Sequence, residues 1–148
     1  MKRNFAIFSF LPFLFFCSGT KPENLGIKEN KLTPCPQTPN CVSSYSSPED
    51  KEHFIKPITY NSSLSEEVNR VKNSAKNLPR AKLIKEEENY LYFEFTSLLM
   101  RYVDDVEFYF DDSAKLIHVR SASRVGKSDF GVNRERIEKF EDEIKKLR

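Results

Sequence analysis

The stretch VDDVEFYFDDSAKLIHVRSA, residues 103–122, decides the fold. Two segments rich in β-branched and aromatic residues, 103–110 and 115–122, flank the polar residues 111–114, which are typical of a four-residue hairpin loop. Apolar side chains alternate with charged ones along both segments, so each strand has one apolar face and one charged face. The stretch therefore predicts an antiparallel β-hairpin.

The two faces of this hairpin also predict its register. If Phe110 faces Lys115, apolar side chains pair on the inner face of the sheet and opposite charges pair on the outer, solvated face. The expected pairs are Phe108 with Ile117 and Val106 with Val119 inside, and Asp105 with Arg120 and Glu107 with His118 outside. A slip of one residue would remove both sets of pairs, so we expect this register.

Outward from the hairpin, the sequence predicts an α+β domain. Further strands are expected at 81–85 and 90–98, and an edge strand is expected at 55–60 because it contains a proline. Apolar stripes predict amphipathic helices at 64–78, after a capping box, and at 137–147. The expected fold is a twisted antiparallel sheet of about five strands with two helices packed on one face.

Composition bounds the size and the partners of the protein. At 148 residues, with 39% hydrophobic and 31% charged residues, the chain suits one compact domain. Lys2 and Arg3 lie in a segment that we expect to be removed, which reduces the basic residues from 24 to 22 and matches the 22 acidic residues. A neutral mature chain gives no electrostatic basis for nucleic-acid binding, so we expect no nucleic acid as a partner.

The N-terminus predicts export. Residues 1–16 read as a signal peptide, because a short basic region precedes an apolar run at 5–16 that is too short to span a bilayer as a helix. Cys17 follows directly, and the surrounding stretch LFFCSG resembles the lipobox of bacterial lipoproteins. We therefore expect a lipid anchor at Cys17 that holds the protein in a membrane of the cell envelope, facing the periplasm or the cell surface. An ordinary cleaved signal and an uncleaved anchor are the alternatives.

The rest of the chain divides into two parts. Residues 17–33 are polar and lack periodicity, so they predict a flexible tether. Residues 34–148 form the single expected domain, which begins with Cys35 and Cys41 around a Pro-rich loop. In an exported protein this pattern predicts a disulfide. A metal site is the alternative, but a zinc ion needs about four ligands and only two histidines remain to complete the set. We expect no metal and no cofactor.

The segment RSASRVGKSDFGVNRERIEKF, residues 120–140, concentrates basic, serine and glycine residues between the last strand and the last helix. Backbone amides at a helix N-terminus, with basic side chains close by, suit a phosphate or a carboxylate. The segment therefore predicts a site for a small anion, and the candidate residues are Arg120, Ser123, Arg124, Lys127, Ser128, Asn133 and Arg134.

The same charges also fit a structural role. Asp104, Asp105 and Glu107 lie on the preceding strand, and with Asp129 they could neutralise the basic residues in a polar network that pins the helix to the sheet. Either Asp129 or Asn133 is expected to cap that helix. The sequence therefore leaves two interpretations of this segment, an anion-binding site and a polar clamp, by which we mean the network that pins the last helix to the sheet.

A hydrolase-like enzyme is the alternative function. It would use Asp104, Asp105 and the segment from Ser121 to Arg134 on an anionic envelope substrate. However, adjacent residues on a strand face opposite ways, and neither Ser121 nor Ser123 lies in a nucleophile elbow. Contact with an envelope protein is a third possibility, through the outward-facing tyrosines Tyr90, Tyr92 and Tyr109. We expect a noncatalytic binding or structural module.

Three motifs resemble the domain of unknown function 1499 family. They are PCPQTPNCVSS at 34–44, VDDVEF at 103–108 and RSASRVGKSDFGVNR at 120–134. The resemblance covers residues 33–142 and implies an uncharacterised protein of envelope or plastid type, with no assigned activity. The stretch LMRY at 99–102 departs from the glycine–aromatic dipeptide expected at that point.

Overall fold

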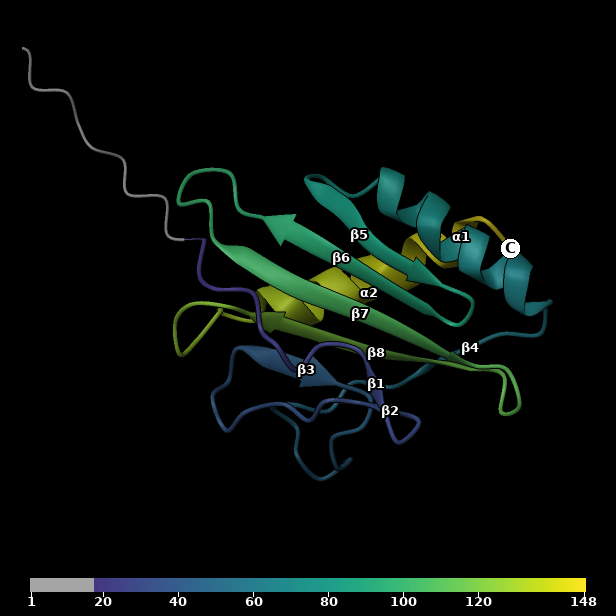
Figure 1. Ribbon diagram of the computed structural model, residues 1–148, viewed down its shortest axis with the longest axis horizontal. Coiled ribbons are helices and arrows are strands. Elements are labelled where there is room, and N and C mark those ends of the chain that lie inside the picture. The colour runs from purple at the N-terminus through teal and green to yellow at the C-terminus, as the bar shows by residue number, and fades with distance from the viewer. Residues whose placement is uncertain (1–17) are drawn as a thin grey trace, which may run out of the picture.

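The computed structural model describes residues 18–148 and has an α+β fold (Figure 1). The main sheet has six strands, one of which, β3, the sequence did not predict; its order is β3-β8-β7-β6-β5, with β4 also paired to β8. The predicted signal peptide and the lipidation site Cys17 lie outside the described residues. The elements are β1 (Ile27–Lys28), β2 (Lys31–Leu32), β3 (Cys41–Ser43), β4 (Ile58–Thr59), α1 (Leu64–Lys76), β5 (Ala81–Glu87), β6 (Tyr90–Thr96), β7 (Val103–Asp111), β8 (Leu116–Ser123) and α2 (Val132–Lys146).

The β7–β8 hairpin forms, but its register differs from the prediction by two residues. Phe110 pairs with Ile117 rather than with Lys115, and Glu107 pairs with Arg120 rather than with His118. The cause lies in the loop: the pairing continues to Asp111, whose carboxylate accepts hydrogen bonds from the backbone N–H groups of residues 113 and 114. Because a shift of two residues keeps every side chain on its own face, the predicted inner and outer faces are correct.

The inner face of the sheet carries the apolar core, and both helices cover it (Figure 1). Phe140 of α2 lies at the centre, with its ring centroid 4.8 Å from that of Phe108 and 5.8 Å from that of Phe93. The capping box at the start of α1 forms as predicted, with Ser63 and Glu66 each bonding to the other's backbone. The amphipathic helices thus supply the layer that a half-apolar sheet needs.

The outer face of the sheet is buried, although alternation of charged residues predicted a solvated face. Residues 18–34, which we call the N-terminal strap, lie across it, and the β1–β2 ribbon lies within this strap. Leu32 is buried against Tyr90, Tyr92 and Tyr109, so these tyrosines are not an exposed surface for a partner. The backbone N–H of Gly26 donates to the Glu107 carboxylate at 2.7 Å. This part of the chain is therefore packed on the domain, in contrast to the flexible tether that its composition indicated.

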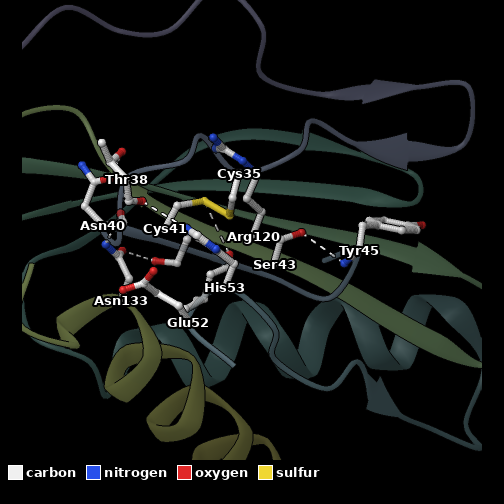
Figure 2. Close-up of a disulfide and its surroundings, with 12 residues drawn as sticks. Cys35, Thr38, Asn40, Cys41, Ser43, Tyr45, Glu52, His53, Arg120 and Asn133 are labelled. Carbon is white, nitrogen blue, oxygen red and sulfur yellow. Dashed lines mark hydrogen bonds between the residues drawn. A yellow bond between two sulfur atoms is a disulfide. The ribbon is translucent and has the colours of Figure 1, made fainter. Parts of the chain in front are cut away.

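The strap ends at the disulfide, which forms between Cys35 and Cys41 as predicted (Figure 2). Cys41 begins β3, and β3 pairs with the end of β8 that leads into the segment 120–140. The disulfide thus holds the chain where it enters the sheet. No helix within residues 18–148 combines the length and the apolar character needed to cross a membrane.

Candidate functional site

The polar residues at the end of β8 divide between the two faces of the sheet. Alternation along the strand directs Arg120 to the outer face and Ser121 to the inner face. Arg124, just after the strand, also reaches the outer face, where it meets Asp105. Because of this division, the segment builds two separate polar clusters rather than one.

The outer cluster consists of buried ion pairs under the strap. Arg124 donates to both carboxylate oxygens of Asp105, at 3.0 and 2.7 Å, and also to Glu94. Arg120 donates to Glu107 at 3.2 Å, and its Nε is buried without a hydrogen-bond partner among the described residues. A buried carboxylate is stable only when it is paired in this way, so these ion pairs give the outer cluster a structural role.

Two tyrosine hydroxyls complete the outer cluster. Tyr92 donates to Asp105 at 2.6 Å, and Tyr90 donates to Glu107 at 2.8 Å. Burial, together with the neighbouring carboxylates, raises the pKa of both phenols, so they remain protonated donors. Burial on its own raises the pKa of Glu94, but hydrogen bonds from Arg124 and Tyr92 outweigh it and hold that pKa below the usual 4.5.

The inner cluster joins β8, α2 and the chain before β3. Ser121 donates to the Asn133 side chain at 2.5 Å, and Asn133 donates to the backbone carbonyl of Asn40 and to the Ser123 hydroxyl, both at 3.0 Å. Figure 2 shows Asn133 and Asn40 facing each other beside the disulfide. These bonds fix the first turn of α2 to the sheet, which agrees with the polar clamp.

Arg136 completes the inner cluster, and sequence reasoning missed it. It donates to Asp104 at 2.5 Å, to Asn133 at 2.6 Å and to Ser121 at 3.1 Å. Its guanidinium also lies over the ring of Phe95, 4.9 Å from the centroid. The available signal was its spacing, because a residue three positions after Asn133 lies on the same face of a helix.

Asp129, not Asn133, satisfies the start of α2. Its carboxylate accepts from the backbone N–H of Gly131 at 3.1 Å and of Asn133 at 2.7 Å. Gly131 is the N-cap residue, with a φ of +84° that favours glycine. One carboxylate therefore occupies the amides that the anion prediction had reserved for a ligand.

The other residues predicted for an anion site lie apart. Arg134 donates to the backbone carbonyls of Lys51 and Glu52, each at 3.1 Å. Lys127 and Ser128 are exposed on the loop. The seven candidates are thus spread over the outer cluster, the inner cluster and the surface, and the structure does not bring them around one point.

The arrangement offers little for hydrolysis. Asp104 faces Arg136 on the inner face while Asp105 faces Arg124 on the outer face, so the two carboxylates cannot act on one substrate. Ser121 is fully buried. One Ser–His contact lies elsewhere, between Ser44 Oγ and His118 Nδ1 at 3.1 Å. Within residues 18–148, no group of three or more His, Cys, Asp or Glu side chains is placed to hold a metal ion.

A cleft of about 230 Å³ lies beside the inner cluster. Arg136 and Asp104 lie at its polar side, and Arg80 and Lys139 add two more basic groups. Apolar side chains form much of the remaining wall, and the residues concerned are Leu78, Pro79, Phe95, Leu98 and Val132. The cleft therefore combines an apolar wall with an excess of positive charge, which is the pattern of a small-molecule site.

Comparison with known proteins gives one match. The model of the family described as "Protein of unknown function (DUF1499)" matches residues 31–144. No curated protein and no solved structure matches the chain. The matched region contains both polar clusters, the disulfide and every residue that lines the cleft.

Proposed function

We propose a function on the basis of the geometry of the cleft. The chain belongs to the DUF1499 family, and the description of this family, a protein of unknown function, assigns no activity. The protein is a noncatalytic binding module, held at a membrane of the cell envelope through Cys17. Its ligand is a small anionic amphiphile, a molecule with one carboxylate or phosphate head and an apolar chain. The observation that carries this proposal is the cleft beside the Arg136–Asp104 pair.

The charge of the cleft supports an anionic head group. Its lining has three basic side chains, Arg80, Arg136 and Lys139, against two acidic ones, Asp104 and Glu135. Arginine has five N–H groups, and the bonds that Arg136 makes within the inner cluster use three of them. The remaining donor capacity, at a residue that lines the cleft, suits a carboxylate or a phosphate.

The walls of the cleft support an apolar chain on the same ligand. Leu98 and Val132 line the cleft and are exposed, and Phe95, which also lines it, is buried in the core. A ligand that covered these side chains would remove apolar surface from water, at about 25 cal/mol per Å². The volume of about 230 Å³ lies below the range of roughly 300–1,000 Å³ that is typical of ligand sites, so it favours a single short chain.

The noncatalytic role is supported by how completely the polar side chains near the cleft are bonded to one another. Ser121, Asn133 and Asp104 all have partners within the inner cluster. A general base or nucleophile needs access to substrate, and side chains buried in a satisfied network lack it. The anchoring role rests on the sequence of residues 1–17.

Titration calorimetry below the critical micelle concentration tests the ligand. Dodecanoate and dodecyl phosphate are expected to bind, and dodecyl maltoside, which has the same chain but a neutral head group, is expected not to bind. The double variant Arg80→Gln/Lys139→Gln should weaken binding of the anionic probes about tenfold, equivalent to ~1.4 kcal/mol. Arg80 and Lys139 lie outside the inner cluster, so the variant should keep its melting temperature.

The double variant Lys145→Gln/Lys146→Gln is the matched control. These residues lie at the other end of α2, and Lys145 pairs with Glu141 in the same i,i+4 spacing by which Lys139 pairs with Glu135. It removes the same charge and should leave affinity unchanged. Equal weakening by both variants, or equal binding of dodecyl maltoside, would contradict a specific anionic site.

A further inference from the structure

One end of the molecule gathers the exposed apolar side chains. Nine large apolar residues are exposed in the described part of the chain, and seven of them lie on two segments, the loop 97–102 and the stretch 124–132, which ends with the first residue of α2. Phe130 is 97% exposed and Leu99 is 85% exposed. The seven are Leu98, Leu99, Met100, Tyr102, Val125, Phe130 and Val132. Side chains of this size gathered at one place mark an interaction surface.

The fold places these two loops together. The first precedes β7 and the second follows β8, and the antiparallel pairing of Asp104 with Ser123 sets the start of β7 beside the end of β8. In Figure 1 both loops lie at the same end of the sheet, where the purple segment that begins the described chain also lies. We call this surface, formed by residues 97–102 and 124–132, the loop end.

The described chain also begins at the loop end. Ser18 lines one hollow together with Thr96 and Arg101. At Gly19 a Cβ atom would lie 2.7 Å from Cγ2 of Val125, so the backbone here is pressed against the second loop. Cys17 directly precedes Ser18 in the sequence. A lipid anchor at Cys17 therefore brings the membrane to the loop end.

The charges of the loop end suit an anionic lipid surface. Arg101 and Lys127 are exposed there, and the one acidic residue of the two loops, Asp129, is bonded to the backbone of α2. The opposite end of the sheet carries acidic turns instead, at 86–88 and 111–112. Basic side chains near a membrane are attracted to anionic head groups, and aromatic and aliphatic side chains insert between them.

We propose that the loop end docks on the surface of the bilayer, with Leu98, Leu99, Met100 and Phe130 inserted at the level of the head groups. This inference rests on the membrane anchoring proposed above, and it adds a fixed orientation to it. Because Leu98 and Val132 belong both to the loop end and to the cleft, the cleft opens beside the lipid. An amphiphile can then pass between bilayer and cleft without crossing water.

The absence of tryptophan from the chain permits a direct test. Full-length protein carrying Phe130→Trp or Leu99→Trp is reconstituted by its own N-terminus into vesicles of phosphatidylethanolamine and phosphatidylglycerol with brominated acyl chains. Both variants are expected to show a blue-shifted emission and to lose most of it to the brominated lipid. Ser113→Trp, in the turn at the opposite end, and Leu147→Trp, near the C-terminus, are the controls and should keep their emission.

The outcomes separate this inference from the anchoring proposal. If the protein floats with the vesicles but no tryptophan is quenched, the anchor stands and the docking is overturned. A blue shift at Phe130→Trp without quenching by brominated lipid would place the loop end against protein, which also overturns the docking. If the full-length protein does not float with the vesicles, both proposals fail. Circular dichroism of each variant checks that the fold is kept.

Discussion

The two faces of the sheet are both buried, but by different means. The inner face is apolar and two amphipathic helices cover it, whereas the outer face carries ion pairs and the N-terminal strap covers it. Burial of the inner face is driven by removal of apolar surface from water. Burial of the outer face requires that each charge keep a partner, because an unpaired buried charge is strongly destabilising. The stability of the inner face therefore depends on the volume of the apolar side chains that fill the core. The stability of the outer face depends on the pairing of its buried charges.

The largest expected effect comes from the inner face. Phe140→Ala removes the ring at the centre of the core, where it is fully buried against Phe93 and Phe108. Loss of transfer free energy together with the cavity left behind should lower the free energy of unfolding by about 4 kcal/mol. Urea denaturation measures the change. A conservative Phe140→Leu should lose much less, and equal losses for both would show that volume does not control this face.

The next effect tests pairing on the outer face. Arg124→Met keeps most of the side-chain volume but leaves Asp105 without its cation, so the free energy of unfolding should fall by about 3 kcal/mol. The double variant Arg124→Met/Asp105→Asn removes both charges and should recover part of the loss. Denaturation of the two variants in urea compares them directly. If the double variant is less stable than Arg124→Met, the pairing of charges does not control the stability of the outer face.

The smallest effect concerns pH. Since Glu94 has a pKa below 4.5 in the folded protein, its ionised form contributes stability above pH 4.5, and that stability is lost as the pH falls through the lower, folded value. Glu94→Gln should therefore lower the melting temperature near neutrality and flatten its further fall below pH 4.5, because the variant lacks the group that titrates there. Melting temperatures between pH 3 and 7, compared with those of the exposed-site variant Glu138→Gln, provide the measurement. If the melting temperature of Glu94→Gln falls with pH as steeply as that of the unaltered protein, Glu94 does not cause the acid sensitivity of the outer face.

The inner face could be predicted from sequence and the outer face could not. Alternation along 103–122 identifies the strands and their apolar side, because the period of a strand is fixed by its geometry. The register was wrong by two residues because the hydrogen bonds of Asp111 set the loop, and alternation is the same for any even shift. Alternating charges are typical of a solvated face, so Glu107 and Arg120 gave no sign of burial. Their cover comes from a strap whose composition is that of a linker.

The candidate site, like the sheet, could be predicted from the sequence only in part. The segment 120–134 was correctly identified as a concentration of polar contacts. Of the two residues expected to cap α2, Asp129 accepts hydrogen bonds from its first turn, although Gly131 holds the N-cap position. The cleft was not predictable, because Arg80, Phe95 and Arg136 are distant in sequence and meet only through the order of the strands. Strand order is a tertiary property, so the local periodicity of the sequence does not predict it.

The contact between Gly26 and Glu107 has a mechanical consequence. A pull on the N-terminus acts first on the contact of Gly19 with the loop after β8, next on the hydrogen bond of Gly26 to the interior strand β7, and then through the Cys35–Cys41 crosslink on β3. The load thus reaches hydrogen bonds that run across the sheet and act together, so they share the tension instead of opening one after another. The N-terminal strap is in this respect attached to the sheet at more than one strand.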